Sequence, residues 1–183
     1  STVAANLALA LAKTGASVGL CDVDIYGPSI PILMNVENEH LASDGAKLTP
    51  VVSHGIEVVS LGFALEPGMA VVWRGPLVHS TVVQFLRDVE WGDKDYLILD
   101  LPPGTGDVQI SLSQQVQATG AILVTTPQKV ALADVTRAKD MFDKLDVPVL
   151  GIIELVRNGL VDRHGDRLGR RIGLVSRVDR GGF

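Results

Sequence analysis

An apolar stretch that stops abruptly at an acid constrains this chain more than any other feature. Residues 96–101 are apolar apart from Asp100, and Pro102 and Pro103 follow at once. Consecutive apolar residues without polar alternation are typical of a strand covered on both faces, as in a parallel sheet with helices on each side. The two prolines prevent the strand from continuing inside a sheet. Because ligands of such sheets bind at the carboxyl ends of the strands, the sequence predicts that Asp100 borders a ligand site.

The residues after Asp100 favour a loop that approaches a ligand closely. Gly104 and Gly106 free the backbone there, and Asp107 can cap a helix expected at residues 108–118. An acid in this position is typical of Mg²⁺ binding against nucleotide phosphates, since Mg²⁺ usually takes one or two carboxylates plus the phosphates themselves. An acid that only caps a turn has the same pattern, and the stretch alone does not decide between the two interpretations.

The composition narrows the class of protein. A chain of 183 residues is most simply one domain, large enough to bury roughly 70% of its unfolded surface. The net charge of −5 argues against a general nucleic-acid binder, and no apolar run reaches the length needed to span a bilayer. The single cysteine, Cys21, excludes an internal disulfide, and we expect it to be buried as a small hydrophobic side chain. The four histidines lack the spacing of metal ligands.

Apolar residues at helical spacing predict a helix that begins almost at residue 1 and ends at Gly15. The apolar run at residues 3–12 has the hydropathy of a signal peptide. However, Asn6 interrupts it and no basic segment precedes it in this sequence. We therefore interpret the run as a buried helix.

A short strand is expected at residues 17–23, ending in two acids and followed by a turn-rich loop at residues 25–31. Alternation places Asp22 and Asp24 on the same side of the strand if it stays extended that far. Two acids at a strand end beside a helix suit the positioning of a metal or a water molecule. Solvated acids in a turn explain the pattern nearly as well.

Strands and helices alternate along the rest of the chain. After a polar surface excursion at residues 35–53, we expect strands at 56–61, 71–73, 121–125 and 147–153, and helices at 77–86, 108–118 and 130–145. Such alternation implies right-handed crossovers, and the sequence predicts an α/β fold with a mostly parallel sheet and helices on both faces. Arg74 lies in a turn from which it could reach a phosphate or carboxylate, although a surface arginine has the same pattern.

Six segments together resemble the Mrp/MinD-type P-loop ATPases, and within that group they are most similar to the Mrp branch. They are DVDIYGPSIP at 22–31, WRGP at 73–76, QFL followed by DVEWG at 84–92, DYLILDLPPGTGD at 95–107, VTTPQKVAL at 124–132 and VPVLGIIE at 147–154. The resemblance covers roughly residues 1–154 and implies a P-loop NTPase fold of the MinD-like architecture. Several independent motifs carry it, so it is far more specific than a lone glycine loop.

The resemblance implies a nucleotide site around the start of the chain. In the family, a loop of the form GKGGxGK leads into the first helix, and Ser1 and Thr2 resemble the two residues that follow that loop. The lysines and amides that cradle the phosphates would then lie before residue 1, and we expect little ATP hydrolysis without them. Ser1 is implied to bind Mg²⁺ through its hydroxyl, and Asp100 to hold the Mg²⁺ shell.

The resemblance also implies roles for residues in the loops. Asp24 would orient the attacking water, with Asp22 beside it as a weaker candidate. Gly104 and Asp107 would belong to the switch loop that senses the terminal phosphate. Two further residues would lie near the nucleotide on the loop after the next strand, Pro127 and Gln128.

The family's activity implies an ATP-dependent, homodimeric carrier or scaffold of iron-sulfur clusters that delivers them to recipient apoproteins. It implies no nucleic-acid or membrane partner and a cytoplasmic location, or an organellar one if a presequence has been lost. A positioning ATPase of the MinD or partitioning kind, and a non-catalytic fragment that keeps only the interaction surface, are the alternatives.

The far end of the chain departs from the family pattern. Glu154 is followed by LVRNG in place of the family's Asn-Met-Ser and, in many members, a Cys-x-x-Cys pair that holds a bridging cluster. Residues 155–183 hold seven arginines and three aspartates, a net charge of +4, whereas residues 1–154 carry −9. This composition is typical of a disordered or loosely docked segment. The expected division is therefore an ATPase domain at 1–154, lacking most of the glycine-rich loop, and a divergent tail at 155–183.

Overall fold

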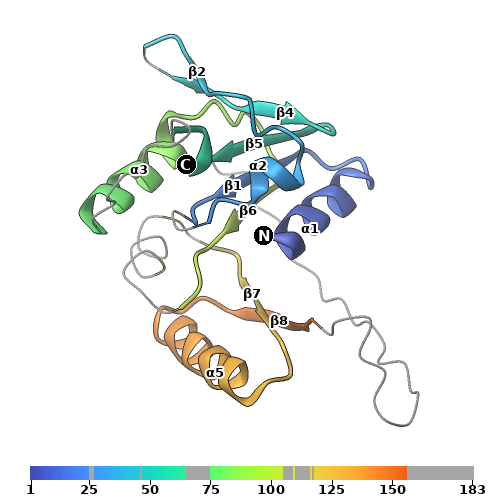
Figure 1. Cartoon of the computed structure of the whole chain (residues 1–183), viewed down its shortest axis with the longest axis vertical. Helices are drawn as coiled ribbons and strands as arrows, with labels where there is room; N and C mark the ends of the chain where they lie inside the picture. Colours follow the sequence, from blue (N-terminus) through green and yellow to red (C-terminus); the bar gives the residue numbers. More distant parts are fainter. Residues whose placement is uncertain are drawn as a thin grey trace. The chain divides into compact units, whose positions relative to one another are not determined.

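The computed structural model describes residues 1–24, 27–45, 47–64, 75–104, 109, 116 and 118–155 (Figure 1). The chain divides into two compact units, of which the first contains the described residues up to 109 and the second those from 116 to 155. Three predicted features lie outside the described residues: the strand at 71–73, Arg74, and nearly all of the tail at 155–183. Most of the predicted helix at 108–118 also lies outside them.

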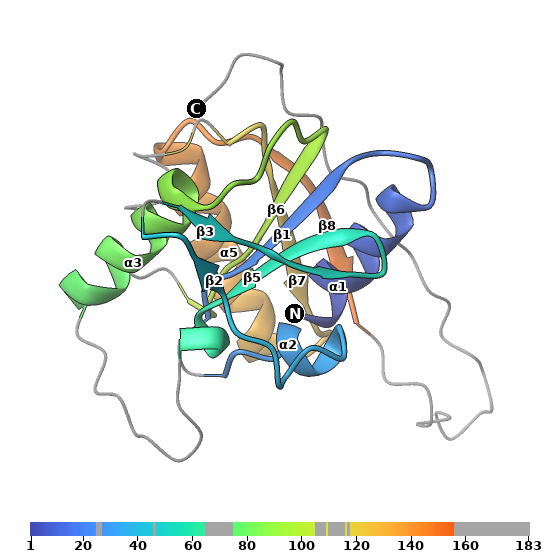
Figure 2. The same ribbon diagram turned by 90° about the horizontal axis from the view of Figure 1, so that it is seen from above.

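The first unit is built on a four-stranded sheet in the order β4 (Val51–Ser53), β5 (Ile56–Ser60), β1 (Val18–Asp22) and β6 (Tyr96–Asp100). The strands β5, β1 and β6 are parallel, and β4 joins the edge antiparallel to β5. The helices α1 (Thr2–Ala12) and α3 (Gly75–Asp88) lie on opposite sides of this sheet (Figure 2). The prediction of an α/β fold with a mostly parallel sheet is therefore confirmed.

The core on one face of the sheet forms between α1 and alternate residues of the strands. Ala5 and Ala8 of α1 are buried and cluster with Leu20, Val58 and Ile98 from three neighbouring strands. Small residues on the inner face of α1 let the helix approach the sheet closely. The prediction of a helix over residues 3–12 is confirmed, and it is one face of this helix that is buried.

The strand buried along its whole length is β1, not β6. Every residue of β1 is buried, whereas in β6 only Ile98 is buried and the other residues are half-buried. The reason is topological, because β1 lies between β5 and β6, whereas β6 is the last strand of the four-stranded sheet. The prediction of a strand at residues 96–100 is confirmed, but the strand is less buried than its apolar sequence predicted. The prediction for Cys21 is confirmed, since it lies fully buried within β1.

The segment expected to be an irregular surface excursion contains short strands. A small antiparallel sheet forms from β2 (Ala42–Ser43) and β3 (Leu48–Thr49), and β4 follows directly. Strands of two or three residues are too short to show a period-2 pattern, so hydropathy could not reveal them. The short helix α2 (Ile30–Leu33) likewise begins inside the predicted loop, and the 3-10 turn η1 (Leu61–Ala64) follows β5.

The second unit pairs β7 (Ala121–Thr125) with β8 (Val149–Glu154) in parallel, joined by α5 (Lys129–Lys144) (Figure 1). These elements match the predicted strands and helix to within two residues. Leu123, Phe142 and Ile153 are buried in this unit, so α5 turns an apolar stripe toward its strands. Among the described residues, no helix is both long and apolar enough to cross a membrane.

Candidate functional site

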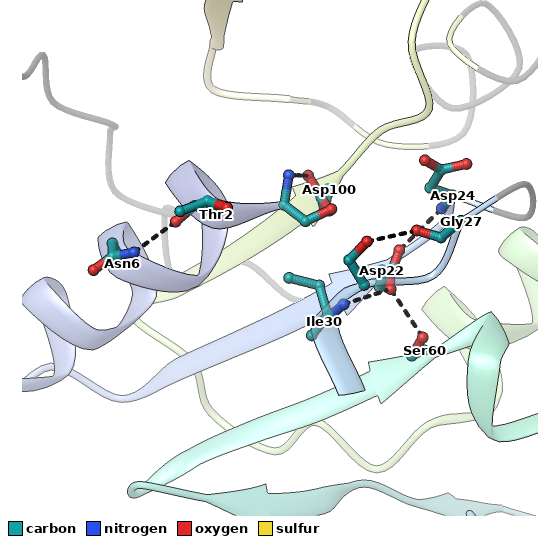
Figure 3. Close-up of polar contacts among 10 residues, drawn as sticks. Thr2, Asn6, Asp22, Asp24, Gly27, Ile30, Ser60 and Asp100 are labelled. Carbon is teal, nitrogen blue, oxygen red and sulfur yellow. Dashed lines mark hydrogen bonds and ion pairs between the residues drawn. The ribbon is translucent and has the colours of Figure 1, made fainter. Parts of the chain in front are cut away.

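Three neighbouring strands of the first unit end in polar side chains on one face of the sheet. The register places Asp22 of β1 opposite both Ser60 of β5 and Asp100 of β6. Side chains alternate along a strand, so these three residues continue the rows of buried apolar residues that face α1. The carboxyl edge of the sheet therefore carries a polar row, Ser60–Asp22–Asp100 (Figure 3).

Asp22 is the most buried member of the row and is held by three donors. Its Oδ1 accepts the backbone N–H of Asp24 at 3.1 Å, and its Oδ2 accepts the backbone N–H of Ile30 at 3.3 Å. The hydroxyl of Ser60 donates to the same Oδ2 at 3.0 Å (Figure 3). Asp22 thus joins β5, the turn after β1 and the start of α2.

This geometry corrects two readings of the Asp22–Asp24 pair. Asp22 is not a solvated turn acid, because none of its surface is exposed. The strand β1 ends at Asp22, although the N–H of Val23 still donates to the carbonyl of Asp100 at 3.0 Å; beyond it, the N–H of Asp24 donates to the Asp22 carboxylate instead of to a neighbouring strand. The side chain of Asp22 therefore accepts hydrogen bonds from the backbone that follows β1, and Asp24 lies one residue beyond Val23 in a half-buried position.

The electrostatics of Asp22 follow from this burial. Desolvation raises the pKa of Asp22 from 3.8 to about 6, and the nearby charge of Asp100 also acts to raise it. The hydrogen bonds from Asp24, Ser60 and Ile30 oppose the rise because they favour the ionised form. Burial outweighs them, so the carboxyl is easier to protonate than an exposed aspartate.

Asp100 and the amino end of α1 meet at the same edge. The amino nitrogen of Ser1 lies 3.3 Å from Oδ1 of Asp100. The other oxygen, Oδ2, is buried and has no hydrogen-bond partner in the part of the chain that the structure describes. Ser1 occupies the N-cap position of α1, but its side chain makes no capping hydrogen bond. A buried carboxylate oxygen that has no partner among the described residues, at the amino end of a helix that begins with a serine, fits a hard cation such as Mg²⁺.

A cation at this edge would need ligands beyond the residues that the structure describes. No group of three or more His, Cys, Asp or Glu side chains that could hold a metal occurs among the described residues. Mg²⁺ is normally bound by one or two carboxylates together with phosphates and water. The edge therefore suits a metal that arrives with a phosphate ligand rather than a closed metal site.

The loop after Asp100 is held by a residue that the sequence did not single out. Gln109 is buried, and its Nε2 donates to the carbonyls of Pro102 at 2.8 Å and Gly104 at 3.1 Å. Gly104 has a φ of 98°, a left-handed conformation that glycine adopts without strain. Asp107 lies outside the described residues.

The structure brings four of the predicted site residues to one edge, Ser1, Asp22, Asp24 and Asp100, with Thr2 opening α1 beside them (Figure 3). Pro127 and Gln128 are exposed and precede α5 in the second unit, so their nearness to a nucleotide stays a prediction. Sequence reasoning missed Ser60 and Gln109. Ser60 had a usable signal, since it is the polar residue that ends an apolar strand in phase with Asp22.

A parallel sheet with an acid at a strand end beside the amino end of a helix is typical of P-loop NTPases. The chain belongs to the NUBPL iron-transfer P-loop NTPase family, whose model, labelled ParA, matches residues 1–167. The family expected from the sequence motifs is thereby confirmed.

Curated relatives agree with this assignment. The iron-sulfur cluster carrier protein of Deinococcus radiodurans is 54% identical over 155 residues, which cover 84% of this chain and 44% of the relative. The iron-sulfur cluster carrier protein of Escherichia coli (strain K12) is 50% identical over 84% of this chain and 42% of its own length. The relative from Arabidopsis thaliana, named iron-sulfur protein required for NADH dehydrogenase, mitochondrial, is 48% identical over 84% of this chain and 50% of its own length. The chain thus spans half or less of the length of these relatives.

Solved structures show the same fold. A nucleotide-binding protein in complex with ADP from Archaeoglobus fulgidus matches with a TM-score of 0.71 at 39% identity, covering 84% of this chain and 59% of that one. The septum site-determining protein MinD from Pyrococcus horikoshii, complexed with Mg-ADP, matches with a TM-score of 0.62 at 23% identity. The match covers 88% of this chain and 66% of the MinD chain. The MinD likeness concerns the fold alone. The much higher identity to carrier proteins disfavours the positioning-ATPase alternative.

Proposed function

We propose that this chain is the nucleotide-binding part of an iron-sulfur cluster carrier, which binds ATP with Mg²⁺ and takes part in cluster assembly and delivery to recipient apoproteins. The proposal depends mainly on one observation: the amino nitrogen of Ser1 lies close to Oδ1 of Asp100, and the buried Oδ2 of Asp100 has no hydrogen-bond partner among the described residues. Membership of an iron-transfer NTPase family and an ADP complex of a similar protein support it.

The residues divide the work of phosphoryl transfer between them. The Ser1 hydroxyl and Asp100 would hold Mg²⁺, which supplies neutralisation of the phosphate charge when bound. Asp24 begins the segment that the Asp22 carboxylate holds, and from there it would orient the attacking water. The remaining nucleotide contacts are assigned by family position to Thr2, Gly104, Asp107, Pro127 and Gln128. Positioning and charge neutralisation dominate this chemistry, so a preceding glycine-rich loop would complete the site.

The cluster is the cargo, and we propose that the carrier works as a homodimer in the cytoplasm, or in an organelle where a presequence directs it there. The one cysteine of this sequence, Cys21, is buried within β1 and its burial raises the pKa of the thiol well above the usual range. A buried thiol of this kind is a poor cluster ligand because the thiolate is the form that binds metal. Cluster ligands would therefore come from outside the described residues of this chain.

Phosphate release tests the nucleotide assignment. The chain as given, the same chain preceded by a GKGGVGK loop, and the loop-bearing chain with Asp24→Ala should be compared with ATP and Mg²⁺. We expect slow hydrolysis only in the loop-bearing form with Asp24 intact. Equal rates in all three would contradict the assignment of the site. Asp100→Asn in the loop-bearing chain should raise the Mg²⁺ concentration needed for nucleotide binding, which titration with a fluorescent ATP analogue measures.

Cluster binding needs a separate measurement. After anaerobic reconstitution with iron and sulfide, a full-length relative that has the Cys-x-x-Cys pair should gain visible absorption from a bound cluster. This chain should not. A cluster bound stoichiometrically by this chain alone would contradict the view that its ligands come from elsewhere.

A further inference from the structure

We propose that Ser60 is a positioning residue of the ATPase site: its hydroxyl fixes the Asp22 carboxylate, and through Asp22 the turn that presents Asp24. The inference rests on the proposed function, because it is the role of Asp24 that gives the turn its importance. It adds a residue from β5, a strand that contributes none of the family-assigned site residues.

The direction of the Ser60 hydrogen bond is defined by its surroundings. Ser60 is fully buried, and its Oγ accepts the backbone N–H of Gly62 at 3.0 Å. A serine hydroxyl has one proton and two lone pairs, and the Asp22 Oδ2 at 3.0 Å accepts that proton. The two hydrogen bonds form a series that points in one direction, from the N–H of Gly62 to the hydroxyl of Ser60 and from that hydroxyl to the carboxylate of Asp22. Aligned hydrogen bonds of this kind strengthen each other in a buried setting.

Asp22 passes this restraint to two backbone N–H groups that follow it in the chain. Its Oδ1 accepts the N–H of Asp24 and its Oδ2 accepts the N–H of Ile30, which lies further along the chain at the start of α2. Ser60 and Ile30 share the same oxygen, so the hydroxyl of Ser60 sets how that oxygen faces α2. A small rotation of the carboxylate would loosen both backbone contacts together.

The corner after β5 also packs against the same turn. A Cβ added at Gly62 would lie 3.2 Å from Pro28 Cβ and from Pro31 Cγ. The backbone at Gly62 therefore touches the prolines that precede and open α2. Ser60 at the end of β5 and Gly62 in η1 therefore both contact this segment, the first through a hydrogen bond by way of Asp22 and the second through close packing. The second contact keeps the segment near its place when the first is removed, which makes Ser60→Ala an informative variant.

Ser53 provides a matched control. Its hydroxyl lies on the adjacent strand β4, is also buried, and donates to the carbonyl of Met34 at 2.6 Å, directly after α2. Ser53→Ala thus removes a buried serine hydrogen bond from the other end of the same short helix without touching Asp22. Ser60→Ala and Ser53→Ala differ in whether the carboxylate loses a donor.

Hydrogen exchange of the full chain tests the structural step. In Ser60→Ala, we expect the amides of Asp24 and Ile30 to exchange about tenfold faster, since a lost hydrogen bond to a charged group has an effect of this size. Ser53→Ala should leave both amides unchanged. Unchanged exchange in Ser60→Ala would overturn the proposal. If Ser60→Ala does not fold, Ser60→Cys keeps a side chain of similar size with a weak donor, and the same comparison applies.

The functional step uses the loop-bearing chain. Ser60→Ala should lower kcat about tenfold with little change in KM, because the turn positions the water rather than the nucleotide. Ser60→Thr, which keeps the hydroxyl, should restore most of kcat. Equal loss of kcat in Ser53→Ala would overturn the role of Ser60. Absence of hydrolysis in the loop-bearing wild type would instead contradict the proposed function, and the exchange experiment would still decide whether Ser60 holds the turn.

Discussion

Replacing Asp22 by asparagine should stabilise the chain more at pH 8 than at pH 4, relative to the wild type. The pKa of the buried Asp22 carboxyl is raised from 3.8 to about 6. A pKa that is higher by one in the folded than in the unfolded state corresponds to about 1.36 kcal/mol, so ionisation of this carboxyl lowers the free energy of unfolding by ~3 kcal/mol at pH 8. The amide of Asp22→Asn cannot ionise and avoids this cost. It keeps an oxygen that can accept from Ser60 and Ile30.

The sign of the pH dependence follows from proton uptake. Between pH 4 and 6 the native state binds the Asp22 proton more tightly than the unfolded state does, because its folded pKa is the higher of the two. The free energy of unfolding should therefore fall as pH rises through this window. In Asp22→Asn this contribution is absent, so the difference between variant and wild type should grow in favour of the variant by ~2.5 kcal/mol from pH 4 to pH 8.

Urea denaturation followed by circular dichroism between pH 4 and 8, with a chelator present, measures this difference. The quantity to compare is the slope against pH, since Asp22→Asn also places an amide group against the N–H of Asp24 and loses that hydrogen bond at every pH. Ser53→Ala is the control, because it removes a buried hydroxyl but no titratable group. Parallel curves for Asp22→Asn and wild type would refute the reasoning.

Three further predictions concern packing and accessibility. Gly19→Ala should lower the free energy of unfolding by about 1–3 kcal/mol in urea denaturation, since a Cβ would lie 2.8 Å from Leu97 Cδ1 and 2.9 Å from Trp91 Cε3. Cys21 should react with a thiol reagent only in denaturant, because burial raises the pKa of its thiol; fast reaction of the folded chain would contradict this. Gln109→Ala should speed proteolysis of the loop after Asp100, because two hydrogen bonds to its carbonyls are lost.

The sequence was sufficient for elements whose pattern is local. The strands β1, β5 and β7 and the helices α1 and α5 were predicted to within two or three residues, since each has a clear run or period bounded by turn residues. Asp100 was placed at a strand end because two prolines follow it. These predictions needed no knowledge of which elements are neighbours.

The features that were missed depend on the neighbours. The full burial of β1 results from strand order, which a single sequence does not specify. The segment β4 is a strand because it pairs antiparallel with β5, and three residues are too few to show a periodic pattern. Gln109 looks like one polar residue in an amphipathic helix, and only the fold reveals that it reaches the carbonyls of Pro102 and Gly104.

The alternation of side chains along the strands places both the core residues and the polar residues of the site on the same face of the sheet. In β1, β5 and β6 every second residue faces α1, and the last residue of each row is polar: Asp22, Ser60 and Asp100. The apolar rows fix the register of the strands, because a slip by one residue would turn the core residues to the other face. The same slip would separate the three polar side chains. The packing of Leu20, Val58 and Ile98 therefore determines the positions of the Asp22 and Asp100 carboxylates. Substitutions in these apolar rows should change the geometry of the site as well as lower the free energy of unfolding.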